Sequence, residues 1–157
     1  MRYTRSVGAI MLIGMWLGGA SACSTVLMNT PVSKTADGWA LTLSQVKIGP
    51  DDYTGEGGVL VAAGEGQKLV WTVLSVRNES GQEQTFSYDT CFLAGKGLSV
   101  PPTAIDRYLE GNAAVDRAEG FDAGQGRTRQ LVYTFPKNQR PTAMICGPIV
   151  LSIPRPK

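Results

Sequence analysis

The chain has 157 residues and no histidine, which excludes Ser-His-Asp and Cys-His catalysis, histidine-ligated zinc and a histidine pH switch. Of its 15 basic residues, Arg2 and Arg5 lie before residue 23, which leaves 13 basic and 13 acidic residues in 23–157 and no formal net charge. The basic residues are scattered rather than gathered into a stripe, so we expect no nucleic-acid-binding surface.

Residues 1–22 have the layout of a secretory signal peptide. Two arginines precede an apolar core, Val7–Leu17, and the small residues Ala20–Ala22 form a cleavage site directly before Cys23. The apolar core is about half the roughly 20 residues that a membrane-spanning helix needs. Residues 6–33 carry no charge, however, so a retained membrane anchor stays open as the alternative to cleavage.

The small residues before Cys23 also resemble a bacterial lipobox, which is cut before a cysteine that carries diacylglycerol. Ala20 stands where leucine is usual, and the same site can be read as the A-x-A signal of ordinary secretion. The resemblance implies a lipoprotein held by acyl chains such as palmitate on Cys23, since each buried methylene contributes about 0.8 kcal/mol. Ser24 in place of aspartate implies, by resemblance to enterobacterial sorting rules, the outer membrane and an orientation toward the periplasm.

A tether is expected after the lipid site. Residues 24–37 are small and polar and include Pro31, so we predict that residues 23–37 link the lipid to a domain at residues 38–157. That domain has a normal size for one folding unit.

The domain is organised around Lys68–Asn78, KLVWTVLSVRN. Leu69 and Trp71 would point to one face of a strand and Val70 and Leu74 to the other, so both faces are apolar. This pattern predicts an inner strand that is paired on both edges and covered on both sides.

Shorter strand patterns separated by glycine turns fill the rest of the domain. A bulge is expected between the first two, because their apolar positions are out of phase. The stretch Thr103–Ala118 could be helical, but Gly111 and Asn112 break its middle, so we predict a loop there that contains at most one helical turn. The pattern predicts an all-β fold, an antiparallel β-sandwich of about seven strands. The expected strands are Trp39–Leu43, Val46–Ile48, Val59–Ala62, Gln84–Tyr88, Cys91–Leu93, Arg129–Phe135, Thr142–Cys146 and Ile149–Ile153.

Two cysteines remain once Cys23 carries a lipid. An oxidising periplasm favours a disulfide between Cys91 and Cys146, and their spacing suits a bridge between the two sheets. A loop of this length gives about 4 kcal/mol in the chain-entropy model. The alternative is a pair of buried free thiols.

Two local motifs resemble the uncharacterised immunoglobulin-like domain found in bacterial lipoproteins. VLSVRNESG at Val73–Gly81 is similar to a strand that ends in a conformation-setting asparagine and a polar turn. DAGQGRTRQLVYTFPK at Asp122–Lys137 is similar to the later turn and aromatic strand, with Ala123 where proline is usual. The resemblance covers about Trp39–Ile153. It implies an immunoglobulin-like sandwich on a tethered protein and carries over no catalytic residue.

Catalytic and metal-binding motifs are weak. Ser44–Lys47 matches S-x-x-K, but in a strand these two side chains point to opposite faces, and the companion motifs are absent. Two acidic groups could hold a cation, yet their spacing fits no known loop, and solvated loop charges are the simpler interpretation. We therefore expect no metal and no cofactor. The two groups are Asp51, Asp52 and Glu56, and Asp116, Glu119 and Asp122.

Aromatic residues offer the best candidates for partner contact. Trp39 and Trp71 fall in strand patterns and are expected in the core, whereas Tyr53, Tyr108 and Phe121 fall in polar segments. Aromatic residues on exposed loops often bind partners, so these three are the predicted contact residues.

The sequence thus predicts a non-enzymatic, lipid-anchored envelope protein that binds another protein or helps to assemble an envelope complex. The predicted binding loops are Gly49–Gly58 and Pro101–Gly126. The alternative is a small-ligand or ion-binding module, including an inhibitor of a periplasmic enzyme. An enzyme is the third hypothesis, and it would require a pocket that gathers the acidic loop residues.

Overall fold

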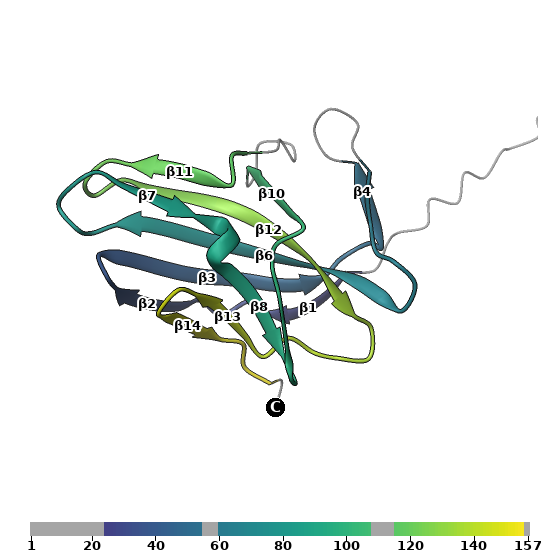
Figure 1. The fold of residues 1–157 in the computed structure, drawn as a ribbon. Coiled ribbons are helices and arrows are strands. Elements are labelled where there is room, and N and C mark those ends of the chain that lie inside the picture. Colours follow the sequence, from purple (N-terminus) through teal and green to yellow (C-terminus); the bar gives the residue numbers. More distant parts are fainter. Residues whose placement is uncertain (1–23, 55–59, 108–114, 156–157) are drawn as a thin grey trace, which may run out of the picture.

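The computed structural model describes residues 24–54, 60–107 and 115–155. The predicted lipid site Cys23 and the predicted contact residue Tyr108 lie outside these ranges. In the described ranges the chain forms antiparallel strands in two layers (Figure 1), which confirms the predicted all-β sandwich. No helix in this part of the protein has the length and apolar character needed to cross a membrane.

The first layer is one twisted sheet in the order β1-β3-β6-β12-β10, with β2 paired to β3 beside β1. Its longest members are β3, β6 and β12, which run side by side across the molecule (Figure 1). The strands of this layer are β1 (Thr25–Met28), β2 (Val32–Ala36), β3 (Trp39–Ile48), β6 (Gln67–Asn78), β10 (Ala104–Arg107) and β12 (Gly126–Pro136).

The second layer consists of two short sheets, β11-β7 and β14-β13-β8-β9. Strands β7 and β8 follow one another with a single 3-10 turn, Tyr88–Thr90, between them. A separate hairpin of β4 and β5 lies against the other face of the first layer. The bounds are β4 (Asp52–Thr54), β5 (Leu60–Ala62), β7 (Gln84–Ser87), β8 (Cys91–Gly95), β9 (Leu98–Val100), β11 (Ala118–Phe121), β13 (Ala143–Cys146) and β14 (Ile149–Ser152).

Strand β6 is the inner strand that the sequence predicts. It pairs with β3 on one edge and with β12 on the other. Val70 and Leu74 face the main core between the layers, while Leu69 and Trp71 face a smaller core under the β4-β5 hairpin. Apolar residues on both faces are therefore explained by two separate cores.

The bulge in β3 is confirmed. The register of β3 against β6 shifts between Leu43 and Gln45, which leaves Ser44 as the extra residue. The shift lets Leu43 and Val46 both reach the main core, where each is fully buried.

The prediction of a tether over residues 24–37 is wrong. Strands β1 and β2 both pair with β3, and Met28 is buried in the main core. The segment resembles a linker because most of its other side chains are small or polar and face solvent at the sheet edge, while Leu27, Val32 and Ala36 pack partly against the core. The dipeptide Asp37-Gly38, with φ of 51° and 78°, closes a two-residue hairpin between β2 and β3 and is a signal for that hairpin.

The prediction of a continuous loop over Thr103–Ala118 also needs correction. Strand β10 pairs with β12 and buries Ile105, and β11 begins at Ala118. Residues 108–114 lie outside the described ranges. The stretches Ala104–Arg107 and Ala118–Phe121 lack the apolar alternation that marks a strand, and pairing with β12 and β7 determines them.

Asn78, the last residue of β6, forms hydrogen bonds to two turns at one end of the sandwich. Its side chain is fully buried. The amide nitrogen donates to the carbonyl oxygens of Gln82, Phe121 and Asp122 at 2.5, 3.0 and 3.3 Å. The amide oxygen accepts from the backbone N–H and the hydroxyl of Ser80 at 2.9 and 2.7 Å. One side chain thus satisfies buried polar groups of two separate turns.

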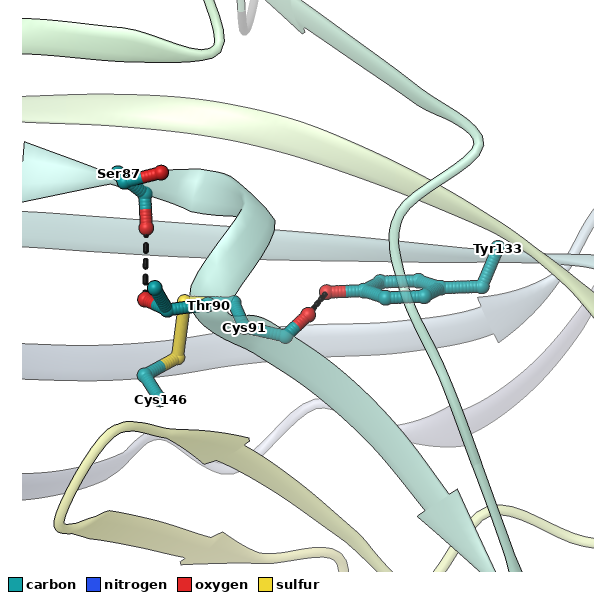
Figure 2. The surroundings of a disulfide bond; sticks show 5 residues. All are labelled: Ser87, Thr90, Cys91, Tyr133 and Cys146. Carbon is teal, nitrogen blue, oxygen red and sulfur yellow. Dashed lines mark hydrogen bonds between the residues drawn. A yellow bond between two sulfur atoms is a disulfide. The ribbon is translucent and has the colours of Figure 1, made fainter.

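The disulfide Cys91–Cys146 is present, but it does not link the two layers. It joins β8 and β13, neighbouring strands of one sheet, in which the two cysteines are direct cross-strand partners. Figure 2 shows that the hydroxyl of Tyr133, from the first layer, donates to the carbonyl oxygen of Cys91 at 2.8 Å. Burial raises the pKa of Tyr133, so its hydroxyl stays protonated and remains a donor. The link between layers at this point is therefore this hydrogen bond.

We expect Asn78→Ala to lower the free energy of unfolding by about 2–3 kcal/mol, because it leaves several buried polar groups without a partner. Asn78→Asp should cost more, since it places a carboxylate against three carbonyl oxygens. Urea unfolding measures both effects. Ser80→Ala is the matched control and should cost about 1 kcal/mol; an Asn78→Ala loss no larger than this control would contradict the role given to Asn78.

Replacing both cysteines, as Cys91→Ala with Cys146→Ala, should lower the free energy of unfolding by about 4 kcal/mol, because the bond closes a loop of 55 residues. Thiol labelling of the unfolded, unreduced protein should find neither cysteine, while a reduced sample should label both. Stoichiometric labelling without reduction would show that the bond is not formed.

Candidate functional site

The predicted contact residues Tyr53 and Phe121 are not exposed. Tyr53 is 9% exposed, its ring lies 4.5 Å from that of Trp71, and its hydroxyl donates to Asp106 at 3.0 Å. Phe121 ends β11 and is completely buried, with its ring 5.5 Å from that of Trp39. The interpretation of both as loop residues for partner contact is therefore wrong, because short strands turn these rings inward among polar neighbours.

One acidic candidate is a structural residue. Glu119 on β11 accepts hydrogen bonds from Tyr88 at 2.8 Å and from Arg129 on β12 at 2.8 and 3.0 Å, and Arg127 lies 3.4 Å away. Burial by itself raises the pKa of Glu119, but these hydrogen bonds and charges outweigh it and hold the pKa below its usual value. The carboxylate thus joins the two layers as a permanent anion, which does not suit a general acid or base.

The other candidate groups do not assemble a site. Asp51 lies 3.5 Å from Lys137 in an exposed ion pair, and Glu56 is outside the described residues. Among the described residues, no three acidic or cysteine side chains come together as a metal site. Ser44 donates to the carbonyl oxygen of Val73, whereas the ammonium group of Lys47 lies 5.8 Å from the ring centre of Trp71. The two residues of the S-x-x-K motif therefore have different partners.

An aromatic groove lies beside β7. It has a volume of about 310 Å³ and opens to solvent between β7, the β2–β3 turn and the β13–β14 turn. Its apolar lining includes the rings of Trp39 and Phe86 and the turn Cys146–Pro148, and its polar lining includes Asp37 and the hydroxyls of β7. We call this depression the Trp39 groove. Its lining residues are Asp37, Trp39, Thr85, Phe86, Ser87, Thr90, Cys146, Gly147 and Pro148.

Trp39 supplies the floor of the groove. It begins β3 directly after the Asp37-Gly38 turn and is half-buried. Its ring meets Phe86 edge-on at 5.0 Å and Phe121 at 5.5 Å, in the geometries that aromatic pairs prefer. Because Phe86 in turn packs on Tyr88 at 5.2 Å, the floor is a rigid aromatic cluster continuous with the core.

Strand β7 presents a free backbone edge to this groove. In the described part of the chain it pairs only with β11. The backbone N–H of Tyr88 donates to Arg117, and hydrogen-bonded pairs alternate along an antiparallel ladder. Thr85 and Ser87 therefore direct their backbone groups away from β11, toward the groove. The carbonyl oxygen of Ser87 already accepts from the Thr90 hydroxyl at 2.7 Å (Figure 2), which leaves the groups of Thr85 and the N–H of Ser87.

The groove exists because β13 stops early. Strand β13 runs beside β8 and ends at Cys146, opposite Cys91, where β7 gives way to β8. Gly147, with φ of 55°, then reverses the chain into β14. In the described residues no strand therefore pairs with the second edge of β7. This unpaired edge begins at the disulfide, where β13 ends.

Sequence reasoning missed this site because Trp39 has the alternation of a core strand. The pattern correctly places Trp39 against the core, since it packs on the main cluster. The alternation of Trp39 gives no information on the second edge of β7, where the described residues supply no neighbouring strand. The sequence did contain one signal for this site. The dipeptide Asp37-Gly38 predicts a hairpin turn, and this turn forms one wall of the groove.

No protein-family model matches the chain, and no curated protein sequence matches it. The solved structures that are similar to it include two uncharacterised proteins. An uncharacterised β-sandwich protein from Clostridium difficile 630 is 9% identical and matches 71% of this chain and 79% of its own, with a TM-score of 0.47. A functionally unknown protein from Listeria monocytogenes EGD-e is 14% identical and matches 74% of this chain and 70% of its own, with a TM-score of 0.49. With TM-scores below 0.5 and these low identities, the two comparisons assign neither a family nor a function to this chain.

Proposed function

We propose that the protein is a non-enzymatic, lipid-anchored envelope protein that binds an extended segment of a partner protein in the Trp39 groove. The observation that supports this function is the free edge of β7 above an aromatic floor. A partner strand would pair with the backbone of Thr85 and Ser87 and continue the sheet beside β8. This mode of binding takes affinity from main-chain hydrogen bonds and specificity from pockets for alternate side chains.

The shape of the groove favours a strand over a small molecule. Small-molecule sites usually enclose most of their ligand, whereas the Trp39 groove is a shallow depression open along β7. The half-buried ring of Trp39 offers apolar surface to a side chain of such a strand, and the buried ring of Phe86 supports it edge-on at 5.0 Å. The hydroxyls of Thr85 and Ser87 and the carboxylate of Asp37 provide polar contacts at the rim.

The lipid anchor is the second part of the proposal. Its support is the sequence around Cys23, together with the observation that the folded domain begins at once after it, with β1 starting at Thr25. A domain attached this closely to a membrane is confined to one surface, which raises its effective concentration toward partners in the same compartment.

Cys23→Ala should move the protein from the membrane fraction to the soluble periplasm, because it removes the acylated side chain. Immunoblots of the separated fractions measure the shift. Cys23→Ser is the conservative companion and should behave in the same way. Membrane association that persists unchanged in both variants would overturn the lipid anchor and favour a retained membrane segment.

Thr85→Pro should reduce partner capture about tenfold or more, because proline lacks the N–H that faces the groove and lost interface hydrogen bonds cost about 1 kcal/mol or more each. The measurement is in-cell crosslinking from a photoreactive amino acid at Pro148, on the groove wall, with the product identified by mass spectrometry. Thr85→Ala is the matched control: it keeps the backbone N–H and should capture the same product.

A photoreactive residue at Val150 gives the positional control, because it is exposed on the same hairpin but outside the groove lining. Thermal unfolding checks that Thr85→Pro is folded. One dominant product from Pro148, absent from Val150 and lost in Thr85→Pro, supports the groove. Equal capture by Thr85→Pro and Thr85→Ala would show that the edge of β7 is not used.

A further inference from the structure

A second depression lies at the other end of the sandwich from the Trp39 groove. It has a volume of about 330 Å³ and is lined by the β8–β9 turn, the segment after β12 and the end of the chain after β14. Its lining residues are Lys96, Asn138, Gln139, Arg140, Thr142 and Arg155, and we call it the basic pocket. Three of the six carry a positive charge and none is acidic.

Among the described residues, the partners of the Arg140 side chain are backbone carbonyl oxygens. Arg140 donates from one terminal nitrogen to the carbonyl oxygens of Leu27 and Pro154 at 3.1 and 3.2 Å. Behind it, the ammonium group of Lys68 donates to the carbonyl oxygens of Lys137 and Gln139 at 3.2 and 2.6 Å. Carbonyl oxygens orient these cations but do not neutralise them, so the positive charge stays available to a ligand.

The charges are close enough to influence one another. Lys68 is only 8% exposed, and burial followed by the nearby charge of Arg140 lowers its pKa. Asp51, an acidic residue at this end, is paired with Lys137, which does not line the pocket. Because residues 23–157 carry no formal net charge, this local excess is a feature of the fold and not of the overall composition.

Two buried atoms in the lining lack a partner in the described residues. They are the Nε of Arg140 and the Oε1 of Gln139. A buried N–H without an acceptor costs free energy that a bound acceptor would recover. One terminal nitrogen of the Arg140 guanidinium is held by two carbonyl oxygens, while its Nε is buried without an acceptor in the described residues. A guanidinium group suits an oxyanion such as phosphate.

The basic pocket lies at the end of the domain where the chain leaves toward Cys23. Strand β1 starts at Thr25, opposite Ile48, and Ile48 in turn pairs with Val70 near the beginning of β6. Leu27, which accepts a hydrogen bond from Arg140, is four residues from Cys23. Four residues span at most about 14 Å, so an acylated Cys23 would hold the pocket at the membrane surface.

We infer that the basic pocket binds a phosphate group, supplied by the headgroup of an anionic phospholipid in the membrane that holds the protein. Lys96 and Arg155 would contact the phosphate from the rim, and the guanidinium of Arg140 would add its positive charge to the lining. The source of the phosphate rests on the lipid anchoring proposed above, whereas the phosphate chemistry of the pocket does not. Nothing in the inference depends on the Trp39 groove.

The test uses the full chain with Cys23→Ala, so that binding is independent of acylation. Its cosedimentation is measured with vesicles of phosphatidylglycerol and phosphatidylcholine and with vesicles of phosphatidylcholine alone. A basic residue near an anionic surface contributes about fivefold in affinity. Lys96→Gln with Arg155→Gln should therefore weaken binding to the anionic vesicles by about 25-fold. These two side chains are exposed, and the pair of changes leaves the hydrogen bonds of Arg140 in place.

Lys34→Gln is the control for the loss of a positive charge elsewhere on the surface, because Lys34 is exposed on β2 and lies outside the pocket. Strong preference for anionic vesicles, lost in the double variant and kept in Lys34→Gln, supports the inference. Equal loss in Lys34→Gln would show unspecific charge attraction and overturn it. Inorganic phosphate that raises the melting temperature while neither vesicle binds would overturn the lipid as the source. Absence of any binding would overturn the pocket while leaving the anchor and the groove untouched.

Discussion

The double burial of β6 is the constraint on which the rest of the sandwich depends. A strand that is apolar on both faces must be paired on both edges and covered on both sides. Strands β3 and β12 meet the first requirement. The second layer covers one face and the β4-β5 hairpin covers the other. Asn78 then ends the strand and holds the turns before β7 and after β11, so the same strand also fixes the place where the second layer begins.

The two ends of the sandwich differ in chemistry. At the end marked by Asn78 lie the Asp37-Gly38 turn, the aromatic floor and the β13–β14 turn that surround the Trp39 groove. At the opposite end lie the start of β1, the Lys68 ammonium group and the basic pocket. In the proposed arrangement the basic end rests on the membrane and the groove is displayed away from it. The two proposals are therefore compatible in space although each stands on different residues.

An incomplete second layer connects structure and proposed function. A sandwich whose strands all ran its full length would leave no groove beside β7. Here β13 ends at the disulfide and turns back, so β7 keeps a free edge next to rings that already belong to the core. The β7–β11 ladder is rigid, because hydrogen bonds from Tyr88 and Arg129 to Glu119 hold β11 against the first layer. A rigid edge with a fixed floor reduces the ordering cost of binding an extended segment.

The sequence by itself determined the local features of this protein. Continuous apolar character identified β6, alternation identified β12 and β14, and a phase change predicted a bulge between Leu43 and Val46, because each pattern reflects which face of a strand is buried. Strands β1, β2, β10 and β11 were invisible to these patterns, since they are short or lie at edges and are defined by pairing with partners far along the chain. Only the tertiary structure decided that Tyr53 and Phe121 are buried, that the disulfide lies within one sheet, and that Trp39 lines a groove. Each of these depends on which distant strand is, or is not, beside the residue, and periodicity along one segment carries no information about its neighbours.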